Sequence, residues 1–296
     1  MKTRLEHFFD YNSKFNLIND ALNNDAKKIN KFHSSNVEYF KMKINFNESK
    51  ESISWHFRNF RSLREIFHSA LMFEESKAIE NEYTITSVFF CKYYSLLHAL
   101  KAVLYLTPIQ NFSPRLGHAQ TVNIFMDNYC QGKRKVFEKD EVVELSTLLR
   151  NLREVTSYQL PHSGSDFLSE KEFRHLEQRL SFYLIKLYQL AHYLSFVLNK
   201  VHKKVDISSN FILFDNMKKE YFYTPHPTKE EYIDFSDKIF ISDTIRADST
   251  YCEPFQLFLE HEEDEFLLYG GFDYLKNSKL QFQLDNVTRF IWKAFI

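Results

Sequence analysis

Side chains that can move protons and bind phosphate recur at helical spacing in the most apolar stretch of the chain. In a predicted helix over residues 84–106, the polar positions that share one face are Tyr94, His98, Lys101 and Tyr105, because residues three and four apart lie on the same side of a helix. Histidine titrates near neutral pH, so His98 is a candidate for proton transfer, and Lys101 is a candidate for phosphate binding. The same spacing also fits a structural His98 whose ring is buried against a neighbouring hydroxyl.

Two arginines form a second candidate phosphate site. Arg150 and Arg153 lie on the edge of a predicted helix over residues 140–158, opposite most of its leucines. A guanidinium at such a position can bind phosphate through two parallel hydrogen bonds. Salt bridges to Glu144 or Glu154 explain the same residues equally well, so both alternatives stay open.

Two further histidines are candidates on local grounds. His118 follows Gly117 at the predicted start of a helix, where unpaired backbone N–H groups favour an anion, although a solvent-facing first-turn residue fits the same pattern. Arg61 and His68, with six residues between them, lie about two helical turns apart on one face. They form either an alternative catalytic pair or the surface charge of an amphipathic helix.

Composition excludes several other chemistries. The chain has 38 basic and 39 acidic residues, so any phosphate site must be local. Its three widely separated cysteines rule out a disulfide framework and a thiolate zinc site. There is no Gly-rich phosphate loop or His-Glu-x-x-His motif, and the acidic run at 260–265 is predicted to be a solvated turn. We therefore expect no cofactor and no metal. The absence of a signal peptide and of a membrane-spanning run predicts a cytoplasmic protein.

The elements that must position these residues form an α+β protein in three parts. Only 5 Gly and 6 Pro in 296 residues favour long helices. Residues 1–50 are predicted to form a helix over 5–29 and a strand over 37–46. Residues 51–204 form an up-and-down helical bundle, and residues 205–296 a β-rich C-terminal region. The bundle consists of the predicted helices 54–79, 84–106, 118–129, 140–158 and 169–203.

The helix over 84–106 must lie inside this bundle. It is apolar nearly all round, so other helices have to cover it on every side. Its small residues Ser95, Ala99 and Ala102 allow one neighbouring helix to approach closely. In the C-terminal region, short β-favouring runs are separated by Asp, Asn, Pro and Gly; they lie at 211–214, 220–224, 238–241, 255–259, 265–269 and 280–284. The last segment, 287–295, fits either a strand or a closing helix.

Three blocks of sequence resemble the HEPN superfamily of helical-bundle proteins, in the family's order. Residues 93–104, with Tyr-Tyr, His-Ala and Lys-Ala pairs, resemble the helix YYAMFHAAKALL of small bacterial HEPN proteins, and YaaC-like proteins show a similar order. Residues 117–125 resemble the start of the family's next helix, and residues 152–158 resemble its R-x-x-A-D-Y block. The resemblance covers roughly residues 60 to 200 and implies a HEPN-like bundle.

The resemblance implies that the protein binds RNA or a nucleotide, as a metal-independent ribonuclease effector in toxin–antitoxin or phage defence. HEPN ribonucleases use an arginine and a histidine separated by four to six residues near a dimer interface, so a homodimer is expected. Here Tyr158 stands where that histidine would follow Arg153. In this scheme Arg153 holds the phosphate, His98 or His118 moves protons, and Tyr158 donates a hydrogen bond.

A second function follows from the altered motif. Because tyrosine is a poor base at neutral pH, the protein is alternatively a non-catalytic interaction subunit of a larger complex. In that case residues 205–296 would contact a protein partner.

Overall fold

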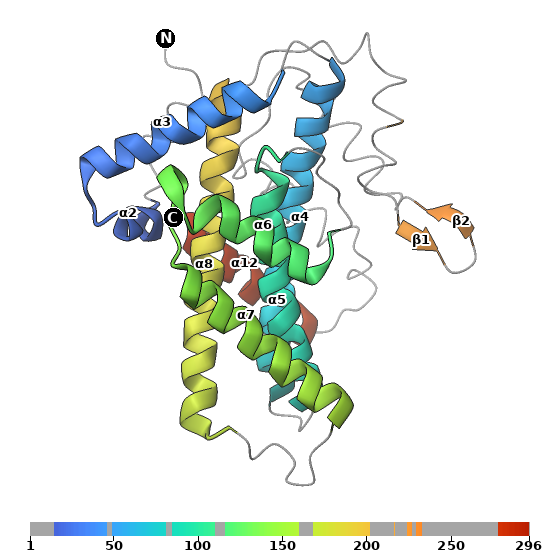
Figure 1. Ribbon diagram of the computed structural model, residues 1–296. Helices are drawn as coiled ribbons and strands as arrows, with labels where there is room; N and C mark the ends of the chain where they lie inside the picture. The colour runs from blue at the N-terminus through green and yellow to red at the C-terminus, as the bar shows by residue number, and fades with distance from the viewer. Residues whose placement is uncertain are drawn as a thin grey trace.

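The computed structural model describes residues 15–45, 49–80, 85–109, 116–159, 168–201, 216, 224–226, 229–232 and 278–295. In these residues, long helices pack side by side around one apolar core (Figure 1). In chain order the elements are α2 (Asn16–Ala21), α3 (Ala26–Lys43), α4 (Ser49–Glu80), α5 (Ile85–Tyr105), α6 (His118–Tyr129), the 3-10 turn η1 (Gly132–Arg134), α7 (Lys139–Glu154), the π-turn η2 (Val155–Gln159), α8 (Glu170–Val201), β1 (Thr224–His226), β2 (Lys229–Tyr232) and α12 (Ser278–Phe295). None of the helices in the described ranges combines the length and the apolar character that crossing a bilayer requires.

Helix α5 lies at the centre of the bundle, in contact with α4, α6, α7 and α8 (Figure 1). Its buried side chains point in all directions, and the apolar ones include Val88, Phe89, Leu96, Leu97, Leu100, Val103 and Leu104. The prediction that other helices enclose this segment is confirmed. The predicted helices of the bundle correspond to α4, α5, α6, α7 and α8 with small differences at their ends.

Helices α4 and α5 approach so closely that serine hydroxyls on α4 reach the backbone of α5. Ser62 Oγ donates to the Ala102 carbonyl and Ser69 Oγ to the Ser95 carbonyl, both at 2.6 Å. Rising numbers on α4 pair with falling numbers on α5, so the two helices run antiparallel. Both hydroxyls are buried, and these bonds satisfy them without admitting water. Two of the small residues expected to permit a close neighbour, Ser95 and Ala102, therefore lie where α5 contacts α4.

Arg58 fixes the end of this helix pair. Its buried guanidinium donates to the carbonyls of Tyr105 and Thr107 at 2.7 Å and of Leu104 at 3.3 Å. These carbonyls lie at the C-terminus of α5, where they have no partner within the helix and where the helix dipole favours a cation. Arg58 thus caps the C-terminus of α5 and fixes the register of α5 against α4.

The α+β prediction is wrong for the part of the chain that the structure describes, which is a helical bundle with one short hairpin, β1–β2. The strand predicted over 37–46 overlaps α3 instead. The buried residues in and directly after α3 are four apart, as in a helix: they are Phe32, Asn36, Phe40 and Ile44. Alternating polarity over a few residues favours a strand, but the buried stripe with a period of four residues extends over a longer stretch and favours the helix.

The C-terminal end is also helical. The run 280–284, predicted as a strand, lies in α12, which packs on α4 and α8. The Phe290 ring stacks on Phe73 at 4.8 Å and meets Tyr188 edge-on at 5.9 Å. Of the open alternatives for 287–295, the closing helix is correct. Thr224, the last residue of the run 220–224, belongs to β1, and the remaining predicted strands lie outside the described residues.

Replacing Ser69 by valine should separate α4 from α5. Ser69 Oγ also accepts a 2.7 Å hydrogen bond from the Tyr188 hydroxyl, so the change removes two buried hydrogen bonds and adds a methyl group at a tight contact. We expect the free energy of unfolding to fall by about 2 to 4 kcal/mol, measured by chemical denaturation. Ser34→Val, the same change at an exposed site on α3, should cost less than about 1 kcal/mol; equal losses would contradict the packing described here.

Candidate functional site

Two groups of titratable side chains lie on either side of the polar face of α5. The first, the α4–α5 cluster, consists of Arg61, Glu65, His68 and His98. The second, the α5–α6–α7 cluster, consists of Tyr93, Lys101, His118 and Arg153. The Tyr94 ring connects them, since its centroid lies 6.4 Å from that of His98 and 5.5 Å from that of His118.

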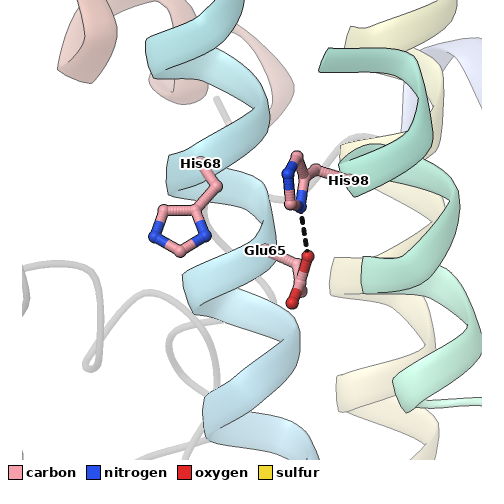
Figure 2. Close-up of side chains that lie close together, drawn as sticks. All are labelled: Glu65, His68 and His98. Atoms are coloured by element: carbon pink, nitrogen blue, oxygen red, sulfur yellow. Dashed lines mark hydrogen bonds and ion pairs between the residues drawn. The ribbon is translucent and has the colours of Figure 1, made fainter. Parts of the chain in front are cut away.

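Glu65 is the centre of the α4–α5 cluster. Its side chain is 3% exposed; one carboxylate oxygen lies 2.6 Å from Nδ1 of His98 and the other 3.0 Å from the Arg61 guanidinium. Figure 2 shows Glu65 on α4 meeting His98 on α5, with the His68 ring on α4 pointing away from His98. The two imidazole rings meet edge-on with their centroids 5.5 Å apart. The buried Glu65 carboxylate thus contacts Arg61 on α4 and His98 on α5. His68 and His98 are themselves half-buried.

These contacts determine the charge of the cluster. Burial alone would raise the pKa of Glu65, but the hydrogen bond with His98 and the charge of Arg61 lower it to about 2. Burial lowers the pKa of His68 to about 4, and the nearby Glu65 offsets only part of that effect. At neutral pH the cluster therefore contains an ionised carboxylate beside an uncharged imidazole.

Tyr93 organises the α5–α6–α7 cluster. Its hydroxyl lies 2.9 Å from Nδ1 of His118, and the Arg153 guanidinium carbon lies 4.7 Å from the centroid of its ring. Among the described residues, Arg153 reaches one carboxylate, that of Glu154, at 3.5 Å. Its buried Nε has no hydrogen-bond partner among the described residues. The Arg153 side chain is 16% exposed, so this cation, held on an aromatic face, is accessible to an anion.

Cations surround His118. Burial lowers its pKa, and the charges of Lys101, Arg153 and His98 lower it further. Burial likewise raises the pKa of Tyr93, so its hydroxyl stays protonated near neutral pH. The ring of His118 is therefore an uncharged base whose Nδ1 is held by Tyr93 and whose Nε2 makes no hydrogen bond to a described residue.

Local backbone structure places Arg153 and His118. Helix α7 ends at Glu154, one residue after Arg153, and the π-turn η2 follows. The Thr86 hydroxyl at the start of α5 donates to the Thr156 carbonyl in that turn at 3.0 Å. Gly117 adopts an extended conformation before α6, so His118 lies in a first turn whose backbone N–H groups have no partner within the helix. Turns of the π type occur often at functional sites.

The predicted site residues divide according to where they lie. Arg153, His118, His98 and Lys101 lie around one face of α5. Arg150 is exposed on α7, close enough for its charge to act on Tyr93. Tyr158 is 79% exposed in the π-turn.

Arg61 and His68 do share a face of α4, and Glu65 lies between them. The alternative of simple surface charge does not describe them, because the Glu65 carboxylate that they adjoin is buried. Glu144, offered as a partner for Arg150, pairs instead with Arg179 at 2.6 Å.

Two important residues were not predicted. Glu65 carried a usable signal, since Glu-x-x-His over residues 65–68 places a carboxylate and an imidazole on one helical face. Tyr93 had no such signal, because its partners come from α6 and α7, and a single helix does not reveal them.

No protein-family model, curated protein or solved structure matches the chain. The geometry of the two clusters is therefore the basis for a functional proposal. The α5–α6–α7 cluster offers cations and a base, and the α4–α5 cluster offers a carboxylate and two imidazoles.

Replacing Lys101 by methionine should raise the pKa of His118, because it removes one of the positive charges that oppose protonation of the ring. We expect an NMR titration to place the His118 pKa below 6.5 in the unmodified protein and closer to 6.5 in Lys101→Met. Lys133→Met, an exposed change in η1, should leave it unmoved. A pKa that is unaffected or falls in Lys101→Met would contradict the proximity of the two side chains.

Proposed function

We propose that the protein binds RNA at the α5–α6–α7 cluster and cleaves it without a catalytic metal. The observation that carries this proposal is the buried Nε of Arg153, which lacks a partner in the described part of the chain and lies beside the uncharged ring of His118. A phosphodiester needs a cation on its phosphate and a base for the 2′-hydroxyl. The cluster offers both groups without drawing on the α4–α5 cluster.

Each residue has a defined role in the proposed reaction. Arg153 and Lys101 bind the scissile phosphate, and Nε2 of His118 accepts the 2′-hydroxyl proton. The 2′-oxygen attacks phosphorus, the bond to the 5′-oxygen breaks, and the imidazolium returns the proton to that oxygen. The products are a 2′,3′-cyclic phosphate and a 5′-hydroxyl. Tyr93 is a positioning residue that orients His118 through Nδ1.

The half-buried Tyr94 favours RNA over an isolated phosphate as the ligand. Its ring lies between the two clusters and packs on the ring of Phe90, with the two centroids 4.5 Å apart. Phe90 is 42% exposed. Aromatic faces beside a phosphate site can stack on unpaired bases, and each stacked base contributes about 1 to 3 kcal/mol. We expect single-stranded RNA to bind better than duplex RNA, because paired bases cannot reach these rings.

A second function is favoured by the position of Tyr158. This residue takes the place of the histidine in the HEPN pattern, yet it is 79% exposed and makes no contact with the α5–α6–α7 cluster in the described residues. In this alternative the protein is a non-catalytic cytoplasmic subunit that binds RNA or a protein partner. We propose a homodimer in either case, on the ground of the HEPN resemblance.

Incubation of the purified protein with RNA in excess chelator tests cleavage. We expect fragments that end in 2′,3′-cyclic phosphate, and a rate that falls by about 10²- to 10⁴-fold in His118→Asn because the base is lost. Arg153→Met should weaken RNA binding and lower its salt dependence. The matched controls are His175→Asn and Arg174→Met, which change exposed residues of α8.

The outcomes separate the two functions. Cleavage that survives in both His118→Asn and Arg153→Met would show that a different site or a contaminant is responsible. Intact RNA together with salt-dependent binding that requires Arg153 would support the non-catalytic subunit. Variants are compared only where circular dichroism shows the helical content of the unmodified protein.

A further inference from the structure

The α4–α5 cluster has no role in the proposed cleavage, yet its composition is that of a metal site. A carboxylate oxygen of Glu65 and one ring nitrogen each of His68 and His98 all lie within 4.8 Å of one another. Glu65 and His68 are three residues apart on α4, and His98 approaches from α5 (Figure 2). Metal sites in helical bundles use this Glu-x-x-His arrangement on one helix with a further ligand from a facing helix.

We propose that Glu65, His68 and His98 bind one divalent transition-metal ion of the zinc class, with water as the fourth ligand. Two imidazoles and one carboxylate are a common protein ligand set for Zn²⁺ with an open position. Mg²⁺ and Ca²⁺ are disfavoured because they prefer oxygen ligands throughout. This metal site is separate from the proposed cleavage site, since it uses none of Arg153, Lys101 and His118.

The geometry requires only small side-chain movements. Zinc bonds of about 2.0 to 2.1 Å in a tetrahedron place neighbouring ligand atoms about 3.3 Å apart. The contact between Nδ1 of His98 and the Glu65 carboxylate, now 2.6 Å, must therefore widen, and His68 must move closer. His68 is free to do so because neither of its ring nitrogens makes a hydrogen bond to a described residue, and its side chain is half-buried at the edge of the bundle.

The cluster also contains a residue that can orient the ligand carboxylate. Arg61 binds Oε1 of Glu65 at 3.0 Å, while Oε2 faces His98. If the ion takes Oε2, Arg61 keeps the other oxygen and becomes an outer partner of the kind that fixes ligating carboxylates. Its positive charge also repels the metal ion, so the net effect of Arg61 on metal affinity is the difference between orientation and repulsion.

The three ligands come from both helices of the central pair, so one ion can connect them. An ion at this position would join α4 to α5 beside the serine hydrogen bonds and would stabilise the folded state by mass action. The ion thus stabilises the contact between α4 and α5.

Titration of the metal-free full-length protein with Co²⁺ at pH 7.5 tests the site. Co²⁺ takes the same ligands as Zn²⁺, and in a tetrahedral site it gives visible absorption bands. We expect one equivalent to produce these bands, Zn²⁺ to abolish them, and Mg²⁺ in excess to leave them. Absence of the bands, or their loss to Mg²⁺, would overturn the proposal.

Ligand variants then locate the ion. His68→Asn is the least disruptive change because His68 makes no hydrogen bond in the described residues; it should weaken Co²⁺ binding at least about 10-fold. Glu65→Gln should weaken binding by at least the same factor, while His175→Asn on the surface of α8 should leave it unchanged. Binding in His68→Asn and Glu65→Gln that equals binding in the unmodified protein would place the ion elsewhere and refute the site.

A third measurement needs no variant. X-ray absorption at the zinc edge of the loaded, unmodified protein should show two imidazole ligands at about 2.0 Å and oxygen for the remainder. A shell made of oxygen alone would contradict the assignment.

The variant His118→Asn should retain the full Co²⁺ spectrum. A failure of the cleavage proposal and a failure of the metal proposal are therefore distinguishable.

Discussion

The close antiparallel contact of α4 with α5 is the constraint on which the rest of the molecule depends. Hydroxyl groups on α4 bond directly to carbonyls of α5, and Arg58 binds the C-terminal carbonyls of α5. Such short bonds permit only one register between the helices. That register places Glu65 opposite His98. A shift by one helical turn would break the contact of the buried Glu65 carboxylate with His98 and leave it only Arg61 of its own helix.

Both clusters follow from the central position of α5. A helix in contact with four others has few directions in which a polar group can remain near solvent, and its half-buried polar residues include Tyr94, His98 and Lys101. His98 turns toward α4, while Tyr93 and Lys101 turn toward α6 and α7. Burial then changes the acid–base properties of the neighbouring imidazoles in the same direction, and both His68 and His118 have lowered pKa values. One structural cause thus prepares two different sites.

The sequence predicts local features well and tertiary pairings poorly. The apolar surface of α5 predicted an enclosed helix, and the spacing of His98 and Lys101 predicted a shared polar face. The strand predictions at 37–46 and 280–284 were wrong because a short alternating run fits a strand or a helix. In α3 every fourth residue is buried, and in α12 Phe290 packs on the core, so both segments are helical. Glu65 and Tyr93 were missed because their roles depend on which helix faces them.

The most direct test of this account is a double-mutant cycle between Glu65 and His98, measured by chemical denaturation in the presence of chelator. Glu65→Ala, His98→Ala and the double variant give the interaction energy of the two side chains across the α4–α5 contact. The account predicts a favourable coupling of about 1 to 3 kcal/mol near neutral pH. Additive effects, with a coupling near zero, would mean that the two side chains do not meet and that the proposed register is wrong.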